Sequence, residues 1–139
     1  MSAFALMDCR IEINSVVMSA FNTGVTLPLE YEALEDTAMG DTARSRIAGL
    51  GDSTLQAGWN QDFAGSATDI TLYTAFATRA PVVCKVRPTS AAISATNPEY
   101  VGSYLPNQHT PFGNSVGEKA TTDTSWPLSD PDGVARNTS

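Results

Sequence analysis

Apolar and polar residues alternate at every second position in several short stretches of this chain, and this pattern restricts the fold more than any other feature. In residues 7–14 (MDCRIEIN), Met7, Cys9, Ile11 and Ile13 share one side. Successive side chains of a β-strand point to opposite faces, so the pattern predicts a half-buried strand. The same reasoning predicts further strands within residues 27–36, 53–63, 81–88, 99–105 and 118–128.

The predicted strand at residues 27–36 (LPLEYEALED) differs from the others because its polar positions are acidic. We expect Leu29 and Tyr31 to point toward the core, which directs Glu30 and Glu32 away from it together. The alternation predicts which side of the strand is exposed to solvent. It leaves open whether that exposed side faces the outside of an assembly or its lumen.

One segment, residues 65–81 (GSATDITLYTAFATRAP), has the periodicity of a helix. Ser66 and Asp69 have capping-box spacing, and Pro81 predicts the end of the helix. A helix of about a dozen residues is marginal alone, so we expect it to dock on a sheet. Its apolar stripe is predicted to contain Ile70, Leu72, Tyr73, Phe76 and Ala77, and its outward face Thr71, Thr74 and Thr78.

These elements predict a mainly β fold in a single domain covering residues 1–139. Six to seven strands and one flanking α-helix favour a β-sandwich or a small barrel. The 42% hydrophobic content is high enough for one core and too high for a disordered chain. The predicted core residues are Ile11, Leu55, Trp59, Phe63, Leu72, Phe76, Val82 and Val86.

Two segments are predicted to lie outside the regular strands. Residues 37–52 contain three glycines and read as a long loop, and such a loop in a compact domain is functional or mobile. Arg44 and Arg46 in this loop are either solvated or paired with carboxylates of another chain, because arginine suits bidentate pairing. Residues 129–139 are predicted to form a short final strand or a C-terminal arm.

The sequence offers few groups for catalysis or metal binding. His109 is the sole histidine, which argues against catalytic triads and multi-histidine metal sites, and we expect it on an exposed loop or edge strand. Cys9 and Cys84 both fall on apolar strand faces, so they are expected to be free buried thiols, and their pairing in a disulfide stays open as the alternative. They are far apart and lack supporting histidines, which argues against a zinc site. A glycosidase needs only two carboxylates, and the spacing of those present does not indicate one. We therefore expect neither an enzyme nor a bound cofactor or metal.

The charge of the chain also limits its partners. Fifteen acidic residues against eight basic ones give a formal net charge of −7 at pH 7. Such a chain lacks the basic stripe of proteins that grip nucleic acid phosphates. Its apolar runs fall short of the roughly 20 residues needed to span a bilayer, and the first residues lack a secretory pattern. No membrane anchor is expected, and folding is expected in a cytoplasm.

The order of several segments resembles that in major tail (tail tube) proteins of long-tailed bacteriophages. The segments are GDTARSRIAGLGD, a strand ending in NQDF, AGSATDITLY, VRPTSAAISATNPEYVGS and GNSVGEKATTDTSWP. VRPTSAAISATNPEY is the most specific of them, and the resemblance covers about residues 37–127. The match rests on the order of the segments, since none of them is a catalytic signature.

The resemblance implies a structural virion protein of the phage tail, assembled in the host cytoplasm. Such proteins form stacked, hexameric rings, and the resulting tube delivers DNA that passes through without specific binding. The implied partners are further copies of the chain and the terminator, tape-measure and baseplate proteins. The candidate contacts between subunits are Arg44, Arg46, Ile47 and Leu50, and the candidate lumen residues are Glu30 and Glu32.

Two other readings remain open from the sequence. A head–tail connector or capsid-decorating protein would also be a small acidic β domain. A carbohydrate-binding sandwich or small glycosidase would need exposed aromatic side chains beside carboxylates. Trp59 and Trp126 both lie on predicted strands and are expected to be used in the core.

Overall fold

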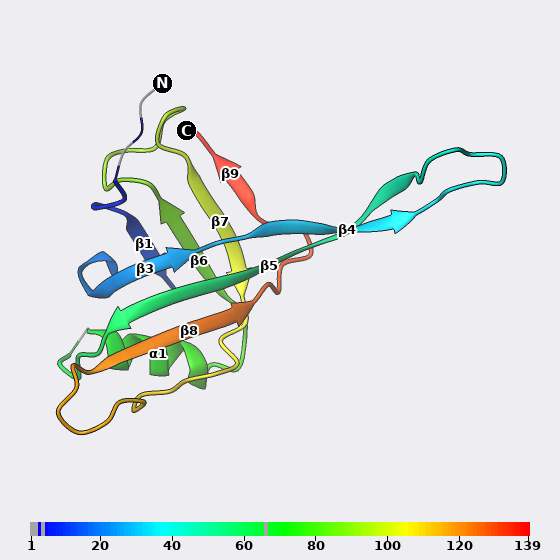
Figure 1. Cartoon of the computed structure of the whole chain (residues 1–139). Coiled ribbons are helices and arrows are strands. Elements are labelled where there is room, and N and C mark those ends of the chain that lie inside the picture. Colours follow the sequence, from blue (N-terminus) through cyan, green and yellow to red (C-terminus); the bar gives the residue numbers. More distant parts are fainter. Residues whose placement is uncertain (1–2, 4, 66) are drawn as a thin grey trace.

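The computed structural model describes residues 3, 5–65 and 67–139 and shows a sandwich of two β-sheets with one α-helix in that part of the chain (Figure 1). The predicted β-sandwich with a flanking helix is confirmed, and the sheets do not close into a barrel. The elements are β1 (Arg10–Ile13), β2 (Val16–Val17), a 3-10 turn η1 (Ser19–Phe21), β3 (Asn22–Thr26), β4 (Leu29–Glu35), β5 (Arg46–Asn60), α1 (Thr68–Ala77), β6 (Val82–Arg87), β7 (Glu99–Tyr104), β8 (Thr121–Pro127) and β9 (Ala135–Asn137).

The two sheets differ in how far they extend. The five-stranded sheet has the order β2-β1-β6-β7-β9 and is antiparallel throughout. The second sheet is built around the 15-residue strand β5. The C-terminal half of β5 pairs with β3 and β8, whereas its N-terminal half pairs with β4 alone in a hairpin that projects from the body (Figure 1).

The core lies between the two sheets and under α1. Ile11, Leu55, Trp59, Leu72 and Val82 are buried there, as predicted, and Val86 packs against the core while only partly buried. Trp126, Tyr104, Ile13, Met18 and Cys84 complete it. Phe63 is exposed, so its predicted core position is wrong. It follows the end of β5 at Asn60, where the strand alternation no longer applies.

The buried face of α1 shares only Leu72 with the predicted one. Thr68, Thr71, Leu72 and Ala75 face the core at helical spacing, and the Thr68 hydroxyl donates to the Asn60 carbonyl over 2.7 Å. Phe76 is 38% exposed, so its predicted place in the core is wrong, and Ile70 and Tyr73 are also exposed. Small side chains on the buried face let the helix lie close to the sheet, which sequence hydrophobicity alone does not reveal. The capping-box residue Ser66 lies outside the described residues, and the N-cap is Ala67, without a side-chain cap.

Two further predictions are corrected by the projecting hairpin. Residues 46–52 continue β5 instead of forming a loop, so the predicted loop 37–52 is reduced to a turn around residues 36–45. Strand β4 exists as predicted, but Leu29 and Tyr31 are exposed rather than buried. Alternation identifies the two faces of a strand, and a face becomes buried only where another layer covers it. No element of the described chain covers β4.

The two cysteines are both free thiols. Cys84 is buried on β6, and its burial raises the pKa of the thiol to about 12. Cys9 is half-buried, and the pKa of its thiol is raised by burial and by the neighbouring carboxylate of Asp8. Because the thiolate is the reactive form, Cys84 should be inert in the folded protein at neutral pH.

We expect the Cys9→Ser variant, which keeps only Cys84, to resist a thiol-specific disulfide reagent at pH 8 until it is unfolded. The raised pKa also makes stability pH-dependent. The unfolded thiol ionises first, so stability from Cys84 is complete below the ordinary pKa near 9 and is lost as pH rises toward 12. Rapid labelling of the folded variant would contradict the burial of Cys84.

Candidate functional site

The projecting β4–β5 hairpin is the first candidate site. All seven residues of β4 are exposed, as are residues 46–48 and 50–52 of β5. The exposed side chains include five large apolar ones, namely Leu29, Tyr31, Leu34, Ile47 and Leu50. An isolated two-stranded hairpin is marginally stable in water, and exposed apolar patches mark interaction surfaces. The hairpin is therefore shaped to meet another surface.

One face of the hairpin combines apolar side chains with two acids, Glu32 and Asp36. Leu34 lies opposite Ile47 in the strand register. A Cβ atom placed on Gly49 would lie 2.9 Å from Glu32 Cβ and 3.3 Å from Leu34 Cδ1, so these residues share that face. The Asp36 N–H donates to the Ser45 carbonyl over 2.9 Å, which continues the pairing one step beyond β4. Asp36, two residues after Leu34, therefore extends the same face.

The hairpin is also strongly acidic. Residues 29–60 carry six carboxylates against two arginines. Glu30 lies opposite Asp52, and like charges opposite one another destabilise a strand pair. Arg44 Nε lies 3.9 Å from Glu35 Oε1, with both side chains largely exposed, and Arg46 lies opposite Glu35. Such an exposed pair contributes under about 1 kcal/mol, so it leaves the arginines available to other partners.

All six residues that the sequence singled out lie on this hairpin. Arg46, Ile47 and Leu50 are on β5, Glu30 and Glu32 are on β4, and Arg44 precedes β5 in the turn. The sequence predicted that the four candidate contact residues lie in a loop and that Glu30 and Glu32 lie on a strand that covers the core. The structure brings both groups onto one projecting element.

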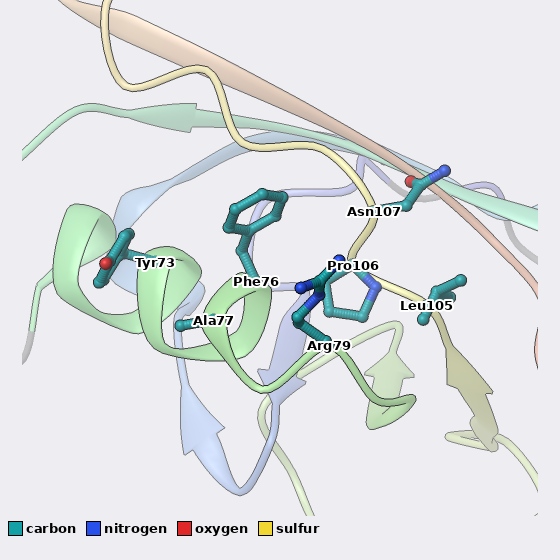
Figure 2. A pocket seen from close by; sticks show the side chains of 7 residues that line it. All are labelled: Tyr73, Phe76, Ala77, Arg79, Leu105, Pro106 and Asn107. Atoms are coloured by element: carbon teal, nitrogen blue, oxygen red, sulfur yellow. The ribbon is translucent and has the colours of Figure 1, made fainter.

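The second candidate site is a groove of about 590 Å³ beside α1 (Figure 2). One wall is the exposed face of the helix, with Tyr73 and Phe76. The opposite wall is the segment after β7, which contributes Leu105, Pro106 and Asn107. The side chain of Arg79, just beyond the helix, lies close to Pro106 at one end of the groove (Figure 2). The groove thus combines aromatic surface with one cation.

His109 fixes the segment that forms the second wall. Its side chain is only 9% exposed, and Nε2 lies 3.5 Å from Asp69 Oδ1 at the start of α1. The imidazole is tilted against the rings of Tyr73 and Phe76, with centroids 6.0 and 6.1 Å away. The predicted exposed loop position of His109 is therefore wrong. The residue lies on a loop, but the aromatic face of α1, left free by the core, covers it.

Hydrogen bonds hold the rest of this segment in place. Gln61 Nε2 donates to the Pro111 carbonyl over 2.8 Å, and the Thr122 hydroxyl donates to the Thr110 carbonyl over 2.7 Å. Phe112 then stacks on Phe63 with ring centroids 5.5 Å apart, and both rings remain exposed. The groove is therefore preformed, and an exposed aromatic pair extends the apolar surface on this side of the molecule.

Arg79 occupies an unfavourable backbone conformation at the end of the helix. Its φ is +55°, and its N–H donates to the Phe76 carbonyl over 3.2 Å. This left-handed position after a helix favours glycine, and another residue there costs about 1–2 kcal/mol. The guanidinium forms no ion pair within the described chain. The backbone at position 79 would thus suit glycine better, yet the residue there is an arginine whose cationic side chain lines the groove.

Among the residues that the structure describes, no group of three or more histidine, cysteine, aspartate or glutamate side chains is close enough to hold a metal ion. Of the helices in the described part, none is long and apolar enough to cross a membrane. The features that stand out are two surfaces suited to protein contacts.

The fold is shared with chains of solved gene transfer agent particles. No protein-family model and no curated protein sequence matches the chain. A chain in the structure described as the virion of a native gene transfer agent particle matches 97% of this chain and 99% of its own length, with a TM-score of 0.77 and 11% identity. A chain in the tail of an empty gene transfer agent particle, refined with C6 symmetry, matches 86% of this chain and 82% of its own, with a TM-score of 0.65 and 10% identity. The chain therefore has the fold of these particle proteins along nearly its whole length.

Proposed function

We propose that this protein is a tail tube protein, a structural virion component that assembles into stacked rings. The observation that carries the proposal is the fold match to a virion chain over nearly the full length of both chains. The second match, to a particle tail refined with C6 symmetry, supports rings of six. The sequence resemblance to bacteriophage tail tube proteins rests on segment order and supports the same function independently.

The shape of the chain supports self-assembly. The hairpin projects from one side, and its exposed apolar residues lack a covering layer (Figure 1). A contact between two different surfaces of identical chains repeats from copy to copy, giving a closed ring or an open stack. Arg44, Arg46, Ile47 and Leu50 on the hairpin are the proposed subunit contacts. Assembly would cover their apolar surface and complete their ion pairs.

The charge of the chain supports a conduit for DNA. A net charge of −7 at pH 7 gives the protein little affinity for phosphates, so DNA would pass without binding. We propose that Glu30 and Glu32, toward the base of the hairpin, line the lumen. Residues 11–43 contain no lysine or arginine, which leaves the charge of these two carboxylates uncompensated within that stretch.

Reversing both lumen charges is expected to slow DNA ejection. In particles carrying Glu30→Lys and Glu32→Lys, the DNA phosphates would bind the lysines of the lumen wall. The attraction would be strongest at low salt, because at 0.1 M salt the charges are screened beyond about 10 Å. The neutral Glu30→Gln, Glu32→Gln pair should have an intermediate effect. Ejection is measured by dye release from assembled particles across salt concentrations. Parental rates in all of them would show that these residues do not line the channel.

The proposed function is tested by the size of the particles that the purified protein forms. Sedimentation at rising concentration, followed by negative-stain microscopy, should show rings and hollow tubes whose length varies. A head–tail connector would stop at a single ring. A protein that stays monomeric at every concentration would contradict the proposal.

A further inference from the structure

The chain carries two apolar surfaces that cannot cover each other within one copy. The hairpin projects on the side of the body away from α1 (Figure 1), and the groove lies beside α1. Tyr73 is 53% exposed in the groove, and Leu34 and Ile47 are similarly exposed on the hairpin. A chain that covers both surfaces needs at least one other molecule.

The two surfaces are complementary in charge. Arg79 is a cation without an ion-pair partner in the described chain, at the end of an otherwise apolar groove. Asp36 is an exposed carboxylate on the same hairpin face as the apolar pair Leu34 and Ile47, and it too has no ion pair there. Arginine and carboxylate form strong charge-assisted hydrogen bonds when they are brought together out of water.

We propose that the groove beside α1 receives the hairpin of a second copy of this chain. Leu34 and Ile47 of one copy pack over Tyr73 and Phe76 of the next, and Asp36 pairs with Arg79. Glu32, on the same face but nearer the base of the hairpin, stays outside this contact. The groove volume of about 590 Å³ is enough for a few side chains, in the range of ordinary binding pockets. This inference rests on the proposed function, because it assigns the surface that takes up the hairpin during assembly.

The backbone of Arg79 supports this role. Arginine occupies a left-handed position that favours glycine, at a cost to the fold. Strain of this kind persists where a side chain serves a purpose. The contact is also directional, since each copy offers one hairpin and one groove. Every copy except those at open ends would then use both surfaces.

A charge-swap experiment tests the pairing. We expect Arg79→Glu and Asp36→Arg each to raise the critical concentration for assembly at least about tenfold, because each places like charges in the contact. The double variant, with the charges exchanged, should return to within about threefold of the wild type. Lys119→Glu makes the same change in net charge as Arg79→Glu at an exposed loop position and should leave assembly unchanged. Pelleting at a series of protein concentrations gives each value.

The variant Arg79→Gly separates folding from assembly. Glycine relieves the left-handed strain, so the variant should melt at or above the wild-type temperature and still assemble poorly. Normal assembly of Arg79→Glu, or a double variant no better than either single one, would overturn the proposed pairing. A wild-type protein that remains monomeric would contradict the proposed function and the docking together. Single rings that respond to the charge swap would support the docking and contradict the tube.

Discussion

Replacing Trp59 with alanine is expected to lower the free energy of unfolding by about 3–5 kcal/mol. The side chain is fully buried near the C-terminal end of β5, between the two sheets. Its indole N–H donates to the Thr124 hydroxyl on β8 over 3.1 Å, and that hydroxyl donates to the Ala57 carbonyl. The substitution removes one of the two largest apolar groups of the core and leaves a cavity. Denaturant unfolding followed by circular dichroism measures the loss.

Trp126 provides a matched control for the hydrogen bond. It is equally buried, but its indole N–H has no partner among the described atoms. Trp59→Phe gives up a hydrogen bond worth about 1 kcal/mol, whereas Trp126→Phe removes a buried donor that is already unpaired. We expect Trp126→Phe to be the milder of the two. If Trp59→Ala cost less than about 1 kcal/mol, the sandwich core would be wrongly assigned.

Shortening the hairpin should abolish assembly without unfolding the protein. Tyr31 and Gly51 are cross-strand partners, so residues 32–50 can be replaced by Asn-Gly, which favours the two-residue turns of hairpins. The deleted residues include Arg44, Arg46, Ile47, Leu50 and the proposed groove ligand Asp36. Because the removed strand residues contribute almost nothing to the core, we expect stability to change by about 1 kcal/mol or less.

Assembly should respond much more strongly than stability to this deletion. The shortened protein loses the whole hairpin interface, and we expect its critical concentration for assembly to rise more than 100-fold. This corresponds to a loss of about 2.7 kcal/mol or more in the free energy of adding one subunit. The Arg44→Ala, Arg46→Ala variant, which keeps the apolar face, should assemble weakly and isolates the contribution of the two arginines. Tubes of normal length from the shortened protein would show that the hairpin is not a subunit contact.

Strand patterns in the sequence predicted the sandwich because most strands are covered on one face. Ile11 and Ile13 on β1 and Val82 and Cys84 on β6 alternate with residues that are less buried, and the structure buries these four. The prediction failed at β4, where the same alternation occurs on a strand that no layer covers. It failed again at residues 46–52, where glycines at positions 49 and 51 suggested a loop. In the structure, Gly49 lets Glu32 and Leu34 pack across the hairpin.

The groove could not be predicted from the sequence, because its parts are distant along the chain. The helix face with Tyr73 and Phe76 is the more apolar one, and it was expected in the core. The buried face instead relies on Thr68 and Ala75, whose small side chains allow close packing against the sheet. Burial of the single histidine beside Asp69 follows from this rotation of the helix. Arg44 and Arg46, two of the proposed subunit contacts, were chosen from composition, since two arginines in an acidic stretch are visible without a structure.

Cryo-electron microscopy with helical reconstruction of the assembled protein tests the central claim most directly. We predict hollow tubes of stacked rings with sixfold symmetry, in which the β4–β5 hairpin of each copy lies against α1 of another. The density at that contact should place Asp36 of one copy beside Arg79 of the next. Solid filaments, isolated rings at all concentrations, or a monomer that never assembles would contradict the account.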